Sequence, residues 1–262
     1  SSKLNFMNIF RVILLFFILI PPLKANTIYN LIKIPNLEIY EINSLNKLKY
    51  FYASKSFRLG VQKNIICLNS NKKDYDHKYG IINYNLNKYS KDFLKKINLK
   101  YIVMCENLSI SGINTAGIPN NIMKTLILDI KFNKKYFERT IHHEVFHIIN
   151  DSFKEVFNEN DWIKFNNKNF EYAECSTCSD RLNLDTFKNT NGFFTQYSQS
   201  TPSEDMAETY SHIMSLSPEK LKEISEKDFI LRRKITFIKL RLLKIYKNFN
   251  FPGDMKTKMT LG

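Results

Sequence analysis

The chain has 262 residues, of which 39 are Lys or Arg and 25 are Asp or Glu, so its formal net charge at pH 7 is +14. The cations are spread along the chain, without an arginine-rich cluster or a basic stripe interleaved with aromatic residues. This distribution argues against specific nucleic-acid binding and predicts only a weak attraction to anionic surfaces. The length suits one domain or a small pair, and we expect a monomer.

Residues 7–25 have the layout of a signal peptide. Arg11 provides the positive flank, residues 12–23 are apolar and interrupted only by two prolines, and Ala25 offers a small residue for cleavage. The apolar run is shorter than the ~20 residues that a membrane-spanning helix needs. We therefore expect cleavage after Ala25 and a secreted or periplasmic protein. The alternatives are an uncleaved anchor and a buried strand.

Residues 26–133 read as strands with one helix. Strands are predicted at 48–54, 64–69, 101–107 and 125–130, and the helix at 88–97. Residues 124–130 come just before the next helix and are the natural edge strand for binding an extended peptide. The loop 111–119 before them either shapes a cleft or is a simple turn.

The chain has four cysteines, an even number that in a secreted protein favours disulfides. Cys67 and Cys105 lie in apolar strand-like runs, where free buried thiols fit equally well. Cys175 and Cys178 form a CxxC sequence, which is a weak zinc motif without a second pair. They form either a local disulfide or halves of longer bridges.

A helix predicted at 134–150 contains the run His143-Glu144-Val145-Phe146-His147. Residues four apart share a helical face, so both imidazoles can reach one zinc ion while Glu144 faces its open position. The flanking residues are apolar, and a buried helix accommodates such polar groups only when something satisfies them. The alternative is a pair of surface histidines beside a solvated glutamate.

A catalytic zinc usually has three protein ligands. Asn150 and Phe153 stand where the metzincin motif needs a glycine and a third histidine, which excludes that version. The best third ligand is Glu204, on a helix predicted at 203–215 with Ser203 as its N-cap. Glu208 shares its face and can accept the free N–H of a ligand histidine. First-turn acids that suit the helix dipole are the alternative. The competing third ligands are Glu171, Glu174, Asp151 and His212.

Residues 158–201, between the two ligand helices, are predicted to be mostly loop, and helices follow at 218–226 and 228–248. In the last helix, cations alternate with Ile, Leu and Phe at helical spacing. Such a helix can lie on a membrane surface or a partner, but it more often closes a fold with a solvated basic face. A mixed sheet followed by helices is an α+β architecture.

The HExxH run, Tyr197 and the run Glu204-Asp205-Met206-Ala207-Glu208 resemble gluzincin metallopeptidases. The likeness is to the catalytic-domain pattern of anthrax lethal factor and related bacterial zinc peptidases, and it covers about residues 120–215. In that pattern a tyrosine precedes the ligand glutamate by seven residues, as Tyr197 precedes Glu204. Met206 stands where the pattern has an aromatic residue.

The resemblance implies a zincin-like metallopeptidase domain over residues 26–262, with its sheet in 26–133 and its metal site in 134–250. It also implies zinc as the cofactor, Glu204 as the third ligand and Tyr197 as a hydrogen-bond donor to the oxyanion.

These expectations combine into a secreted zinc endopeptidase that hydrolyses a peptide or protein substrate. Zinc would lower the pKa of a bound water towards about 7, and Glu144 would take its proton as the general base. The alternative is a catalytically inactive zincin-like binding protein, against which the presence of Glu144 counts. A basic nucleic-acid or membrane-binding protein with an accidental HExxH run is a third alternative.

Overall fold

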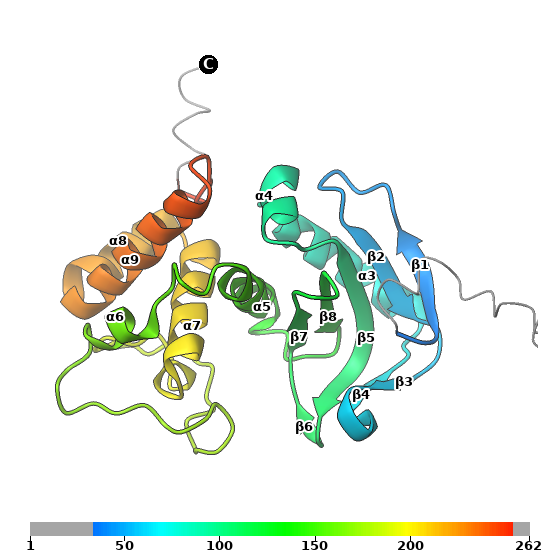
Figure 1. Cartoon of the computed structure of the whole chain (residues 1–262), viewed down its shortest axis with the longest axis horizontal. Coiled ribbons are helices and arrows are strands. Elements are labelled where there is room, and N and C mark those ends of the chain that lie inside the picture. The colour runs from blue at the N-terminus through cyan, green and yellow to red at the C-terminus, as the bar shows by residue number, and fades with distance from the viewer. Residues whose placement is uncertain (1–33, 254–262) are drawn as a thin grey trace, which may run out of the picture. The chain divides into compact units, whose positions relative to one another are not determined.

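In the computed structural model, a mixed β-sheet is followed by a group of helices (Figure 1). The structure describes residues 34–253, so the predicted signal peptide at 7–25 lies outside the described residues. Residues from Asn36 onward form a unit of their own. The α+β class predicted from the sequence is confirmed. No helix in the described range is long and apolar enough to cross a membrane.

The sheet is organised around one long strand, β5. The strands are β1 (Leu37–Glu41), β2 (Lys49–Ala53), β3 (Phe57–Leu59), β4 (Ile65–Leu68), β5 (Tyr101–Ile110), β6 (Ile113–Asn114), β7 (Gly117–Asn120) and β8 (Thr125–Asp129), with a short 3₁₀ turn, η1 (Val61–Lys63), after β3. Along the first half of β5 the order is β1-β2-β5-β8-β7, with β5 parallel to both β2 and β8. Its second half pairs antiparallel with β4 and β6, and β3 pairs with β4.

The edge of the sheet nearest the helices is β7, not the strand that the sequence suggested. β8 lies between β5 and β7, and all five of its residues are buried. The prediction that residues 124–130 form the edge strand is therefore wrong. The loop 111–119 supplies both β6 and the start of β7, whose short, proline-containing sequence does not look like a strand. Pro119 is tolerated there because an edge strand does not need every backbone N–H for pairing.

The helices are α3 (Lys72–Leu86), α4 (Lys91–Lys96), α5 (Phe137–Ser152), α6 (Glu159–Ile163), α7 (Pro202–Ser215), α8 (Pro218–Lys227) and α9 (Phe229–Ile245), with a 3₁₀ turn, η2 (Tyr197–Gln199), before α7. The predicted helices are present within a few residues of their expected ends, but α3 and the short α6 were missed. The buried side chains of α3 are sparse, and Gly80 and two asparagines weaken its helical pattern.

Helix α5 lies at the centre of the described unit. In Figure 1 it lies between β7 and β8 on one side and α7 on the other, and α8 and α9 lie beyond α7. The buried apolar core continues from the sheet through α5 to α9. Within the sheet, a disulfide joins Cys67 on β4 to Cys105 on β5. Cys175 pairs locally with Cys178 in the loop before α7.

Candidate metal centre

Helix α5 presents the HExxH run from a mostly buried position. Ten of its 16 residues are buried, including His143 and Glu144. Apolar neighbours such as Ile141 and Val145 are fully buried around them. The helix is therefore held in place by its packing, which fixes the direction of both histidine side chains.

Helix α7 brings Glu204 to the same place. Its N-cap is Thr201, whose hydroxyl accepts the backbone N–H of Glu204 at 3.2 Å, so the prediction of Ser203 as N-cap is wrong. Pro202 occupies the first helical position, where its lack of an N–H has no consequence. The sequence from Thr201 to Glu204 has the spacing of a capping box, but the Glu204 carboxylate turns towards the histidines of α5 instead.

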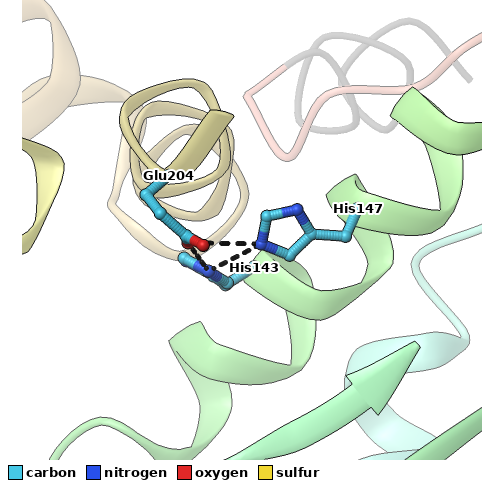
Figure 2. A group of neighbouring side chains, drawn as sticks. All are labelled: His143, His147 and Glu204. Carbon is cyan, nitrogen blue, oxygen red and sulfur yellow. Dashed lines mark hydrogen bonds and ion pairs between the residues drawn. The ribbon is translucent and has the colours of Figure 1, made fainter. Parts of the chain in front are cut away.

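Three donor atoms converge between α5 and α7 (Figure 2). The Nε2 atoms of His143 and His147 are 3.1 Å apart, and Oε2 of Glu204 lies 2.9 Å from the first and 3.3 Å from the second. Ligands that are about 2.0–2.2 Å from a tetrahedral zinc lie roughly 3.3–3.6 Å from one another. The distances between the three atoms are therefore close to those between zinc ligands, although two of them are somewhat shorter.

The Glu208 carboxylate determines which ring nitrogen of His143 carries the proton and which is free to bind a metal. Its Oε1 lies 2.8 Å from Nδ1 of His143, and its Oε2 accepts the hydroxyl of Thr195 at 2.9 Å. If neutral His143 places its proton on Nδ1, towards this carboxylate, the Nε2 lone pair points at a carboxylate oxygen of Glu204. That arrangement is repulsive unless a cation lies between them.

The electrostatics of the cluster point the same way. Burial lowers the pKa of His143, but hydrogen bonds to Glu204 and Glu208 outweigh it and hold that pKa well above its ordinary value. Two carboxylates thus favour a positive charge at this point. A bound metal cation supplies such a charge, so the donor set fits a divalent ion with mixed nitrogen and oxygen ligands.

Glu144 lies against the edge strand. The side chain is 7 % exposed, and burial raises its pKa to about 6 against the opposing effect of the two histidines. A Cβ atom at Gly117 of β7 would lie only 2.7 Å from Cγ of Glu144. Glycine at this position thus leaves the space that the Glu144 side chain occupies.

Tyr197 borders the same cluster from η2. Its ring centroid is 6.0 Å from that of His143. Burial, followed by the negative charges of Glu204 and Glu144, raises the pKa of its phenol above the ordinary value. The hydroxyl therefore stays protonated at neutral pH and can donate a hydrogen bond.

One protein-family model matches more than half of the chain. The family model described as "Putative zinc-binding metallo-peptidase" matches residues 77–247. The chain belongs to this family. It is also similar to the crystal structure of a "putative zinc-binding metallo-peptidase" from Bacteroides caccae, with 19 % sequence identity and a TM-score of 0.49, over 75 % of this chain and 78 % of that one. No curated protein matches the chain.

The other candidates for a third metal ligand lie outside this cluster. Within residues 34–253, only His143, His147 and Glu204 form a group of three metal-binding side chains with converging donor atoms. His212 instead contacts the backbone oxygen of Glu208 through Nδ1 at 2.7 Å and stacks on Phe194. Asp151, Glu171 and Glu174 are not members of the group.

Sequence reasoning did not single out Thr195, Arg139 or Gly117. Arg139 on α5 lies 3.7 Å from the Glu208 carboxylate, and Thr195 contacts it from the loop before η2. The only local signal for Thr195 is its place two residues before Tyr197. Gly117 could not be found at all, because its closeness to Glu144 depends on how β7 packs on α5.

Proposed function

We propose that this chain is a secreted zinc endopeptidase of the gluzincin type, with His143, His147 and Glu204 as the metal ligands. The observation that carries the proposal is the convergence of three donor atoms at 2.9–3.3 Å, with Glu208 accepting from the outer nitrogen of His143. Family membership and the adjacent Glu144 support it.

In this mechanism, zinc supplies Lewis acidity, which lowers the pKa of a water and polarises a peptide carbonyl. Glu144 takes the proton of the attacking water as general base and then delivers it to the leaving amine as general acid. The Tyr197 hydroxyl donates a hydrogen bond to the carbonyl oxygen as negative charge develops on it. Glu208 holds the imidazole of His143 in the tautomer and orientation that binding requires.

The substrate peptide is proposed to add as a strand along β7. The backbone N–H of Asp129 donates to the backbone oxygen of Ala116 at 2.9 Å, so the backbone N–H and C=O groups of Ala116 and Ile118 face β8. Because these directions alternate along an antiparallel strand, the backbone groups of Gly117 and Pro119 face the open edge. Because proline has no N–H, this edge offers one donor, from Gly117, and two carbonyl acceptors. The Gly117 carbonyl already accepts the Thr115 hydroxyl at 3.1 Å.

The test compares zinc content and peptide cleavage in three proteins. The wild type should carry about one zinc per chain and cleave members of a peptide library in a chelator-sensitive way. Glu144→Gln should keep the metal and lose cleavage, whereas His147→Ala should lose both. Undiminished cleavage by Glu144→Gln, or a metal-free wild type, would refute the mechanism.

The competing function is a zincin-like protein that binds partners without catalysis. It predicts a zinc-loaded wild type that cleaves no library peptide, so the same experiment separates the two functions. Secretion is tested independently by N-terminal sequencing of the mature protein, for which a start at Asn26 is expected.

A further inference from the structure

Helix α9 has apolar side chains on two faces. One face is buried and includes Leu231, Ile238 and Leu242. On the opposite face, Phe229 is 60 %, Leu240 is 62 % and Leu243 is 38 % exposed. At 3.6 residues per turn these three side chains fall within a sector of roughly 60°. With the exposed Thr236, which falls in the same sector, they form a row along the outside of the helix that we call the α9 ridge.

Cations border the α9 ridge on both sides. By the same helical geometry, Arg232 and Lys239 lie along one border, and Arg233 and Lys244 lie along the other. The sequence from Phe229 to Gly253 contains no acidic residue. None of these four cations forms an ion pair with another residue in the range 34–253.

The cations are held beside apolar groups, not beside carboxylates. The Arg232 guanidinium lies 5.0 Å from the ring centroid of Phe229, and Lys239 Nζ lies 5.1 Å from that of Phe251. Long cationic side chains that run over apolar surface and end in a charge are typical of groups placed at a water–lipid boundary.

A hollow of about 400 Å³ opens on the border formed by Arg232 and Lys239. Its apolar floor includes Leu221, Ile235 and Phe251, and its lining also includes Lys222, whose Nζ lies 3.7 Å from a carboxylate oxygen of Glu226. Figure 1 shows α8 and α9 side by side on the side of α7 away from the sheet, so this surface lies apart from the metal centre. A pocket with an apolar floor and several cations suits an anionic amphiphile.

We propose that the α9 ridge and its hollow bind an anionic lipid membrane. Phe229, Leu240 and Leu243 enter the interface between headgroups and acyl chains, and the flanking cations contact anionic headgroups. A ridge of exposed apolar side chains between two rows of cations matches this boundary better than it matches other partners. Nucleic acid would place phosphates against the apolar ridge, and a second copy of the chain would bring like charges together.

The experiment measures how much of the mature chain, starting at Asn26 and so without the apolar segment 12–23, sediments with lipid vesicles. Wild-type protein should bind vesicles with equal amounts of phosphatidylcholine and phosphatidylglycerol and stay in solution with pure phosphatidylcholine. Arg232→Gln/Lys244→Gln should weaken partitioning about 25-fold, since each cation near an anionic membrane contributes about fivefold. Leu240→Ser/Leu243→Ser should also weaken it, and this variant keeps the charge unchanged.

The matched control is Lys95→Gln/Lys96→Gln on α4, which removes two exposed cations at another surface. It should bind vesicles as the wild type does, and thermal melting should show that all variants are folded. The proposal is overturned if the wild type does not bind anionic vesicles, or if the control loses as much binding as the α9 variants. It is also overturned if the Leu→Ser variant binds normally, because the attraction would then be charge alone.

Discussion

Gly117→Ala tests whether the edge strand β7 and the side chain of Glu144, our proposed general base, fill one tight space. The new Cβ would lie 2.7 Å from Cγ of Glu144 and 3.0 Å from the backbone oxygen of Ile127. Carbon atoms in contact prefer a separation of about 3.5–4.0 Å, so the distance from the new Cβ to Glu144 would be too short by about 1 Å. Strand β7 cannot lengthen this distance by shifting, because the Ile127 carbonyl of β8 is close to the same Cβ. The side chain of Glu144 must therefore move.

A catalytic group displaced by about 1 Å loses on the order of 10²-fold in rate, which corresponds to about 2.7 kcal/mol of transition-state stabilisation. We expect this loss in kcat/KM of Gly117→Ala on a library-selected peptide. Zinc content should stay at the wild-type level, because the new Cβ does not lie against the donor atoms of His143, His147 or Glu204.

The matched control is Gly80→Ala. Gly80 lies inside α3, and a Cβ there would meet nothing within 4 Å. This variant should keep full activity and gain roughly 0.5–1 kcal/mol of stability, because alanine is a better helix former than glycine. The reasoning is refuted if Gly117→Ala has wild-type kcat/KM, or if its loss of activity is matched by a loss of zinc.

Three further predictions concern the groups around the site. Glu208→Gln should weaken zinc affinity 10–100-fold, roughly the effect of losing a ligand's hydrogen-bonding partner, and competition with a chromogenic chelator would measure it; unchanged affinity would contradict this role. Lys234→Met should lower the free energy of unfolding in urea by about 3–5 kcal/mol, because it leaves the fully buried Asp205 carboxylate without its cation; a loss below about 1 kcal/mol would speak against it. Replacing Cys67 and Cys105 with alanine removes a disulfide that joins residues 38 apart and should lower the free energy of unfolding by about 3–4 kcal/mol. An unchanged urea midpoint would count against this stabilising role.

The parts of the site that share a helix could be predicted from the sequence. His143 and His147 lie one turn apart on α5, and Glu204 and Glu208 lie one turn apart on α7, so helical spacing alone places each pair on one face. The buried surroundings of the first pair follow from the apolar residues around it. The resemblance to gluzincins then suggested that the two faces meet.

The order of the strands could not be predicted in the same way. A run such as residues 124–130 is apolar both at an edge and in the interior of a sheet, so its sequence does not say which neighbours it has. The edge is instead β7, whose four residues include a glycine and a proline. Its identity follows from pairing with β8, which is a contact between separate segments that has no periodic signal.

Asp205 shows why the rest of the site was beyond sequence reasoning. It follows Glu204 directly, yet its Oδ2 accepts from Trp162 Nε1 at 2.9 Å and from Lys234 Nζ at 2.7 Å, not from the histidines of α5. Both side chains of the Asp205–Lys234 pair are 0 % exposed.

Two adjacent residues of α7 therefore contact different helices: Glu204 contacts α5, and Asp205 contacts α6 and α9. A rotation of α7 that removed Glu204 from the histidines would also separate the buried charges of Asp205 and Lys234, which is strongly unfavourable. The orientation of Glu204 thus depends on a lysine 30 residues further along the chain, and no local pattern around Glu204 could have revealed it.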